Sequence, residues 1–205
     1  MTSGTANVAT DLAPHLALLD AEGAVRDLIA YVGESPNREG LLDTPRRVVA
    51  MLAEMTRGYH EDPEAILDTV FEDACDEMVV LTGVSFTSLC EHHLLPFAGT
   101  VTLGYVPDGH VVGISKLARV VDAFACRLQL QERLTQQVAH AINDALQPKG
   151  VGVVVRAIHG CMAHRGVARP GAALVTSEMT GVMRTKPEAR AEFLALAYGG
   201  GHHAG

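Results

Sequence analysis

Tryptophan is absent from this sequence and aromatic residues make up only 4% of it, so the hydrophobic core must be built from aliphatic side chains. Positive charge is also scarce, because 16 Lys and Arg face 24 Asp and Glu and leave a formal net charge of -8. An acidic chain is poorly suited to broad, unspecific nucleic-acid binding. An anionic ligand would therefore need a local cluster of Lys and Arg side chains.

Other absences bear on the compartment. The N-terminus lacks the basic and apolar regions of a signal peptide, and no apolar run approaches the ~20 residues that cross a bilayer. The cysteines are too few and too scattered for a disulfide framework; they are Cys75, Cys90, Cys126 and Cys161. We therefore expect a cytoplasmic protein with no membrane or nucleic-acid partner, whose thiols stay reduced and available to a metal.

The 205 residues have the length of one domain with short appendages. Residues 1–15 and 199–205 are expected to be flexible tails. Residues 16–198 are expected to form a single domain that begins with a helical region at 16–75. The predicted class is α+β, with an antiparallel sheet and helices on one face.

Apolar periodicity and turn residues place the expected elements. The predicted helices span 16–32, 44–57, 63–71, 115–127, 131–146 and 187–196, and the predicted strands 78–89, 97–105, 110–114, 151–161 and 173–183. Thr44 and Ser115 are predicted N-caps. The stripe expected to be buried on the 44–57 helix is Val48, Met51, Leu52 and Met55. The stripe on the 115–127 helix is Leu117, Val120, Val121, Phe124 and Leu128, and that on the 131–146 helix is Leu134, Val138, Ala141 and Ile142.

A thiol, a carboxylate and two imidazoles stand in consecutive positions from Cys90 to His93. Cys90 and His93 have the Cys-x-x-His spacing that lets two side chains grip one metal ion. Downstream, His159 and Cys161 would point to the same face of their strand, because side chains alternate along a strand. The sequence therefore predicts a metal site that Cys161 completes with a third ligand.

Three protein ligands leave the fourth position of zinc to water, as in catalytic sites, whereas a fourth protein ligand would make the site structural. Spacing alone leaves this open, with His92, His159, His164 and Cys126 as the available fourth ligands. Cys126 is disfavoured, because helical periodicity places it opposite the buried stripe. If His92 is not a ligand, its imidazole titrates near neutrality beside the metal and suits proton transfer.

An anion site is predicted where the strand ending near Ile114 enters the next helix. Backbone N–H groups at a helix start, with the hydroxyl of Ser115 and the cation of Lys116, would bind an anion, and Arg119 reaches the same side of the helix. A solvated basic edge is the alternative. Arg165, four residues after Cys161, would bring another cation near the metal and would favour a polyanionic small substrate.

Glu132 lies in the first turn of the 131–146 helix, where a carboxylate usually complements the helix dipole. The functional alternative is a carboxylate that accepts two hydrogen bonds from an amidine-like edge, such as N1–H and the 2-amino group of guanine.

Taken together, these segments closely resemble GTP cyclohydrolase I. The resemblance rests on motifs that occur in family order between about Leu16 and Leu196: Cys90-Glu91-His92-His93, Gly113-Ile114-Ser115-Lys116-Leu117-Ala118-Arg119, Arg127-Leu128-Gln129-Leu130-Gln131-Glu132-Arg133-Leu134-Thr135, His159-Gly160-Cys161 and Arg165-Gly166. It implies a tunnelling fold and a homodecamer of two pentamers with active sites shared between subunits.

The resemblance also implies an activity and a set of roles. The activity is zinc-dependent hydrolysis and rearrangement of GTP to 7,8-dihydroneopterin triphosphate and formate, the first step of folate or pterin biosynthesis. Zn²⁺ would be bound by Cys90, His93 and Cys161. Catalysis would use His92 to protonate the opening imidazole ring, His159 to assist, and Ser115 in later steps. The guanine would be held by Glu132 and Gln131, and the triphosphate by Lys116, Arg119, Arg165 and Arg47.

Two positions depart from the family pattern. Some members carry Lys three residues after the arginine that matches Arg47, where this chain has Ala50. His164 stands where members usually have a small or apolar residue. The first departure removes a cation from the expected triphosphate site, and the second places an imidazole beside Arg165.

The same residues are compatible with other functions. A related enzyme could open the purine ring and stop at an earlier product. A non-catalytic nucleotide-binding or regulatory subunit with structural zinc would be favoured if His92 completed a four-ligand site. The retained His92, Ser115 and Glu132 argue against that subunit, and the net charge disfavours a nucleic-acid-binding zinc module.

Overall fold

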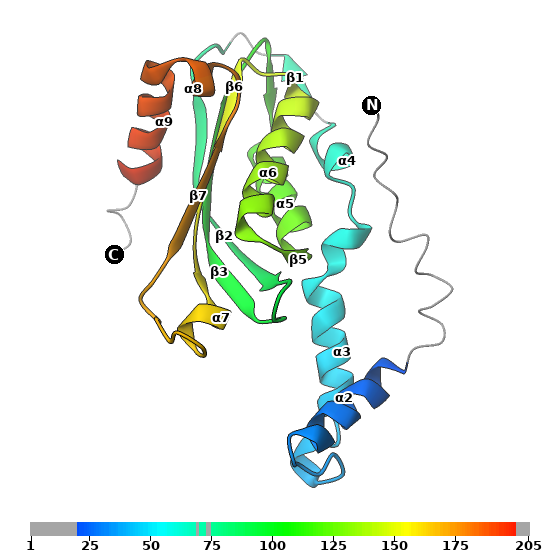
Figure 1. Ribbon diagram of the computed structural model, residues 1–205. Coiled ribbons are helices and arrows are strands. Elements are labelled where there is room, and N and C mark those ends of the chain that lie inside the picture. The colour runs from blue at the N-terminus through cyan, green and yellow to red at the C-terminus, as the bar shows by residue number, and fades with distance from the viewer. Residues whose placement is uncertain (1–19, 69, 73–74, 200–205) are drawn as a thin grey trace, which may run out of the picture.

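The computed structural model describes residues 20–68, 70–72 and 75–199. A five-stranded sheet in the order β5-β2-β3-β6-β7 forms its centre, and Figure 1 shows α5 and α6 lying along one face of this long, twisted sheet. The helical elements are α2 (Ala21–Tyr31), η1 (Glu39–Leu41), α3 (Thr44–Met55), η2 (Arg57–His60), α4 (Pro63–Leu67), α5 (Ile114–Ala125), α6 (Gln131–Leu146), α7 (Gly160–Ala163), α8 (Gly181–Thr185) and α9 (Pro187–Gly199). The strands are β1 (Val70–Glu72), β2 (Val79–Cys90), β3 (Pro96–Val106), β4 (His110–Val112), β5 (Leu128–Gln129), β6 (Gly150–His159) and β7 (Leu174–Met179).

The strand register brings three chain segments together at one end of the sheet. Strands β2, β3, β6 and β7 pair antiparallel, and the short β5 pairs parallel with the end of β2, with Cys90 opposite Gln129. Phe97, at the start of β3, lies opposite His159, the last residue of β6. The end of β2, the start of β3 and the end of β6 are therefore neighbours, and we call this end of the sheet the metal end.

The main core lies between the sheet and helices α5 and α6. Both helices bury the apolar stripes that were predicted for them, including Leu117, Val120, Leu134, Val138 and Ile142. On the strands, alternate residues face this core, among them Val101, Leu103, Val153 and Val155. The predicted α+β class is confirmed, and so is the largely antiparallel sheet.

The expectation that helices cover only one face was wrong. Met183 of α8 and Phe193 of α9 are buried with Val154 and Met179 in a second, smaller cluster. Val154 alternates with the core residues Val153 and Val155 and so faces the opposite side of the sheet. Figure 1 shows α9 beside that second face, near the end of the sheet remote from α7.

Several predicted boundaries shift in the structure. The predicted 173–183 strand ends at Met179, because Gly181 adopts a positive φ of 51° and starts α8. The cap of α3 is Asp43, with Thr44 as the first helical residue. Gly113 precedes α5, so Ser115 lies in the first turn and is not the cap. Leu128 leaves the helix and pairs in β5.

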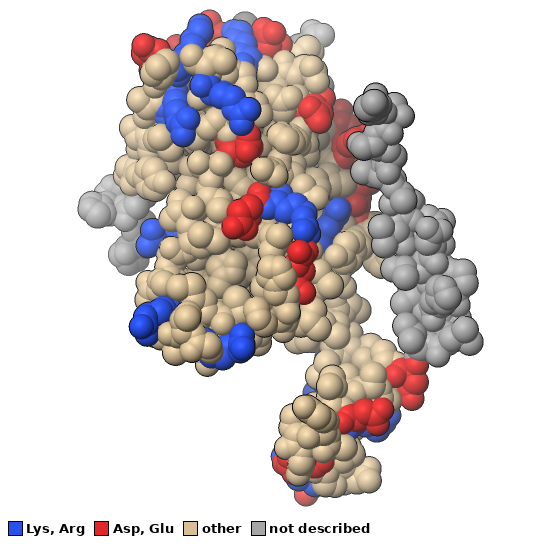
Figure 2. Space-filling view, in the orientation of Figure 1, with Lys and Arg blue, Asp and Glu red and all other residues tan. Residues whose placement is uncertain are grey.

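The N-terminal helices form an arm that stands clear of the body (Figures 1 and 2). Helix α2 contains no buried residue, and Leu28, Tyr31 and Val32 are 63%, 86% and 73% exposed. Met51 of α3 is also exposed, against the prediction of a buried stripe there. The predicted start of the first helix, residues 16–19, and both predicted tails up to residue 15 and from residue 200 lie outside the described residues.

No helix in the described part of the chain is long and apolar enough to cross a membrane.

Candidate metal centre and its surroundings

A tight turn at the metal end holds Cys90 and His93 together. The Cys90 carbonyl accepts hydrogen bonds from the N–H groups of His93 and Leu94, and the Cys90 N–H donates to the Leu95 carbonyl at 2.9 Å. Leu94 adopts a left-handed φ of 54°, a conformation that non-glycine residues seldom take. The turn leaves Cys90 Sγ 3.9 Å from His93 Nδ1.

Cys161 reaches the same place by a route that strand alternation does not describe. Strand β6 ends at His159, and Cys161 lies in the short helix α7, which corrects the predicted strand to residue 161. A Cβ on Gly160 would lie 2.8 Å from the Pro96 carbonyl oxygen, so only glycine lets this backbone pass so close to β3. The ligand atoms of Cys90, His93 and Cys161 all lie within 4.8 Å of one another.

This donor set fits a zinc ion. Bonds of about 2.3 Å to sulfur and 2.0–2.1 Å to nitrogen in a tetrahedral site separate neighbouring ligand atoms by about 3.5–3.8 Å, close to the distance seen between Cys90 and His93. Burial, followed by the neighbouring Cys90 thiol, raises the pKa of Cys161. A bound cation would reverse that effect, because it favours the thiolate.

The predicted candidates for a fourth ligand are not in the three-residue cluster that the described residues form. His92 is exposed, and its ring meets the His93 ring edge-on at 6.1 Å between centroids. His164 is exposed just after α7. Cys126 is buried, against the prediction that it faces away from the core, and burial raises its pKa. The geometry therefore favours an open, three-ligand site.

His159 lies beside this cluster and is held by its neighbours. Its ring stacks on Phe97, with 4.5 Å between centroids and an interplanar angle of 2°. His159 Nε2 is 2.9 Å from Gln131 Oε1. Burial lowers the pKa of His159, and the nearby Glu132 carboxylate partly opposes that effect. Glu132 itself is exposed at the start of α6, so its carboxylate is accessible to a ligand.

An ion pair that sequence reasoning missed joins the metal turn to α6. Arg133 donates two hydrogen bonds to Glu91, at 2.6 and 3.0 Å. These bonds lower the pKa of Glu91 and raise that of Arg133. Glu91 stands between Cys90 and His92, and Arg133 follows Glu132, so the pair connects the metal ligands to the helix that carries the predicted guanine carboxylate.

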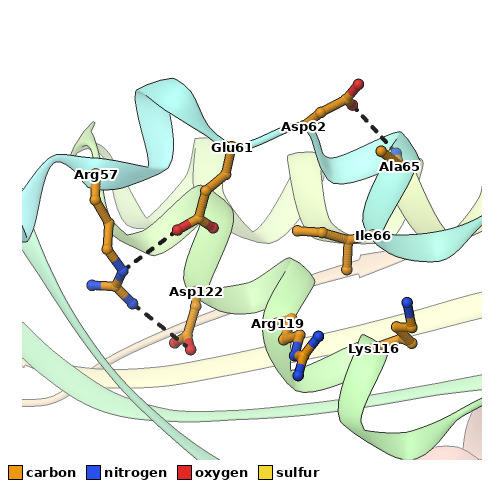
Figure 3. Close-up of a pocket in the computed structure, with 8 residues that line it drawn as sticks. All are labelled: Arg57, Glu61, Asp62, Ala65, Ile66, Lys116, Arg119 and Asp122. Atoms are coloured by element: carbon orange, nitrogen blue, oxygen red, sulfur yellow. Dashed lines mark hydrogen bonds and ion pairs between the residues drawn. The ribbon is translucent and has the colours of Figure 1, made fainter.

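Lys116 and Arg119 line a different site. They lie with Arg57 and Asp122 around a pocket of about 570 Å³ between α5 and the segment from η2 to α4, and Figure 3 shows both basic side chains projecting from α5. Arg57 is engaged by Glu61 at 3.4 Å and Asp122 at 3.9 Å. Among the described residues, neither Lys116 nor Arg119 forms an ion pair, so both cations are available to an anion.

The structure does not bring this basic pocket next to the metal turn of the same chain. Helix α5 starts after β4, where the Val112 N–H donates to the Tyr105 hydroxyl, and Tyr105 pairs with Val79 at the far end of β2 from Cys90. The helix then runs back toward β5, and its length from Ser115 to Ala125 is about 15 Å. Ser115 and Lys116 thus lie remote from the metal end.

The two remaining predicted cations lie in different regions. Arg165 follows α7, and its charge offsets part of the rise in the pKa of Cys161. Arg47 lies on the projecting α3 and is 3.3 Å from Asp43. The structure therefore gathers His92, His159, Glu132, Gln131 and Arg165 around the metal cluster and leaves Ser115, Lys116, Arg119 and Arg47 elsewhere.

Comparison with known proteins agrees with the motifs gathered at this end. The sequence pattern that defines GTP cyclohydrolase I matches residues 21–198. The chain belongs to the GTP cyclohydrolase I family. GTP cyclohydrolase 1 of Wolinella succinogenes is 51% identical over 174 residues, 84% of this chain and 93% of that protein. GTP cyclohydrolase 1 of Chlorobium phaeovibrioides is 53% identical over 174 residues, 84% of this chain and 78% of that protein.

Membership of the GTP cyclohydrolase I family makes this chain an enzyme and confirms the resemblance inferred from the motifs. Among solved structures, the archaeosine synthase QueF-Like aligns with a TM-score of 0.43 and 22% identity over 51% of this chain and 93% of that chain. A likeness at that level carries no argument about function.

Proposed function

We propose that this enzyme converts GTP and water to 7,8-dihydroneopterin triphosphate and formate, and that it requires zinc. The observation that carries the proposal is the convergence of Cys90, His93 and Cys161 at 4.8 Å or less, with His92, His159 and Glu132 at the same end of the sheet, in a chain of this family. Bound zinc would supply a Lewis acid that activates water at neutral pH.

The surrounding side chains then have distinct roles. His92, an exposed imidazole next to a ligand, would donate a proton to the imidazole nitrogen of the purine as the bond to C8 breaks. His159 would assist at the same ring. Glu132 would accept hydrogen bonds from N1–H and the 2-amino group of guanine, which makes it the residue that selects the base. Ser115 would contribute to the later steps, which rearrange the ribose and close the new ring.

The triphosphate would bind to Lys116, Arg119, Arg165 and Arg47. Because Lys116 and Arg119 lie remote from the metal turn of their own chain, we propose that each active site takes its metal end from one subunit and its basic pocket from a neighbour. A ring-shaped homodecamer of two pentamers would supply that neighbour. The exposed apolar side chains of the α2–α3 arm, which has little core of its own, suit burial against another subunit.

The test is incubation of the zinc-loaded enzyme with GTP, following formate release and the fluorescence of the oxidised pterin. Wild type should yield both products, and both should vanish after chelation and return on adding zinc. His92→Ala should bind zinc normally and lose turnover by about 10²–10⁴-fold, while His140→Ala, an exposed histidine of α6, should behave as wild type.

Two results would redirect the proposal. A formylated product without pterin would identify an enzyme that stops after opening the ring. Tight zinc binding without any GTP turnover would identify a binding protein with structural zinc.

A further inference from the structure

We propose that Gln131 is a positioning residue that fixes the ring of His159 and keeps its proton on Nε2, and that it does not contact guanine. The catalytic consequence of this assignment rests on the proposed function, in which His159 assists at the purine. The geometric part rests only on the hydrogen bonds around Gln131, which is 1% exposed.

Two backbone carbonyl groups determine the orientation of the Gln131 side-chain amide. Its Nε2 lies 3.1 Å from the Val155 carbonyl oxygen and 3.1 Å from the Leu174 carbonyl oxygen. A carbonyl can only accept a hydrogen bond, so turning the amide over would place Oε1 against two other acceptors inside the protein. An unpaired buried polar group of this kind costs about 1–3 kcal/mol, and the NH₂ group therefore faces β6 and β7.

Two threonines reinforce the same orientation. The Thr135 hydroxyl donates to the Gln131 backbone carbonyl at 2.7 Å, so its single proton is committed. In the 2.6 Å contact between the Thr135 and Thr176 hydroxyls, Thr176 must then be the donor. Its oxygen is left to accept from Gln131 Nε2 at 3.2 Å, which adds a third acceptor on the NH₂ side.

The orientation of the amide fixes the proton on His159. Gln131 Oε1 faces His159 Nε2 at 2.9 Å and is an acceptor only, so Nε2 must carry the hydrogen. The hydrogen-bond partners of a histidine ring determine which nitrogen carries the proton. In the neutral ring of His159, the proton is therefore on Nε2, and Nδ1 is unprotonated. The parallel stack on Phe97 holds the ring plane.

Because of these contacts, the Gln131 side chain has no free hydrogen-bonding group that could bind guanine. Both polar atoms of its side chain are bonded within the protein and buried, whereas the neighbouring Glu132 carboxylate is exposed. This reassigns Gln131 from the guanine-binding set that the resemblance implied and leaves Glu132 as the base-selecting residue on α6.

The direct test is solid-state NMR of the zinc-loaded, full-length protein labelled with ¹⁵N in its histidine rings. The His159 signals, identified by their loss in His159→Asn, should show a protonated Nε2 and an unprotonated Nδ1. Gln131→Met, which removes the acceptor that faces Nε2, should abolish that single pattern. A His159 spectrum unchanged in Gln131→Met would overturn the proposal.

A matched pair of threonines separates positioning from general destabilisation. Thr176→Val removes one support of the Gln131 amide. Thr180→Val removes a hydroxyl of the same neighbourhood that bonds the Val151 N–H and Asn143, remote from His159. Thr176→Val should broaden or shift the His159 signals, and Thr180→Val should leave them unchanged even if it lowers the melting temperature.

Kinetics supply the second readout. Gln131→Met should lower kcat for formate release by about 10- to 100-fold, the usual loss when a partner that orients an imidazole is removed, with the Kd for GTP unchanged. A Kd for GTP that weakens by a similar factor with kcat preserved would instead make Gln131 a guanine ligand. If the wild type releases no formate, the proposed function fails, and the ring-nitrogen signals still decide whether Gln131 fixes His159.

Discussion

The metal end of the sheet and the basic pocket on α5 differ in how complete they are within one chain. At the metal end, strand pairing, the turn after Cys90 and the starts of α6 and α7 bring together three ligand atoms, two catalytic candidates and the carboxylate proposed to bind guanine. The pocket lined by Lys116 and Arg119 has a volume of about 570 Å³, but none of the three proposed metal ligands lines it, and neither does His92 or His159. In the proposed function, the reactive centre is completed within one chain, and the charge of the substrate is met by a neighbouring subunit.

The largest effect is expected from breaking the metal end. Cys161→Ser should remove stoichiometric zinc and bring formate release to the level of the chelated wild type, because a hydroxyl is a far poorer zinc ligand than a thiolate. Zinc content by atomic absorption and the formate assay would check it. Cys126→Ala changes a buried thiol outside the cluster and should keep full zinc, and loss of zinc in both variants would point to unfolding instead.

Mixing two inactive variants tests whether the two regions belong to one chain or two. His92→Ala and Lys116→Ala subunits, co-assembled in equal amounts, should recover about one quarter of the wild-type activity if each site joins the metal end of one subunit to the basic pocket of the next. Lys116→Ala mixed with Arg119→Ala damages the same half in both partners and should recover nothing. Absence of recovery in the first mixture would argue for sites completed within one chain.

Glu132→Ala sharpens the assignment within the metal end. Loss of charged hydrogen bonds to the base should weaken the affinity for GTP by about 10- to 100-fold, with zinc content unchanged. Isothermal titration with GTP would measure it. Glu188→Ala is a matched control, since Glu188 is also a first-turn glutamate, on α9. An unaltered Kd for GTP in Glu132→Ala would remove that residue from the guanine site.

The smallest effect concerns the ion pair between Glu91 and Arg133. Because the pKa of Glu91 is lowered in the folded protein, its contribution to stability is present above the unfolded pKa of about 4.3 and is lost as the pH falls through the folded value. Glu91→Gln should therefore be slightly less stable than wild type at pH 7, and the difference should disappear in acid. Thermal unfolding of both zinc-free proteins would measure this.

An exposed pair elsewhere calibrates that measurement. The pKa of Glu34 is also lowered, because its carboxylate accepts hydrogen bonds from Arg38. Glu34 lies in a loop that is far along the chain from the metal turn, so Glu34→Gln serves as a control. If Glu91→Gln also lowers zinc affinity and Glu34→Gln does not, the Glu91 pair orders the metal turn as well as adding stability. Equal effects of both variants would reduce it to an ordinary surface ion pair.

Local patterns in the sequence were enough for elements whose chemistry is local. The stripes of α5 and α6 followed from helical spacing because each helix has one sheet-facing side. The Cys-x-x-His pair could be predicted because a single turn brings two residues three positions apart into contact. The boundaries at His159, Met179 and Gly113 were missed because each depends on a close approach or a backbone conformation that the neighbouring segments impose, such as the contact of Gly160 with β3.

By itself, the sequence determined the chemistry available to this protein: a thiol and an imidazole at metal-ligand spacing, a distant second thiol, a first-turn carboxylate and a basic helix start. Only the tertiary structure decided which of these groups share a site, because strand register, not distance along the chain, sets which side chains meet. It placed Cys161 against Cys90 and His93, and it turned Gln131 inward onto His159. It also placed Lys116 and Arg119 on α5 away from the metal end of their own chain. For this reason we propose that a second subunit contributes the basic pocket to each active site.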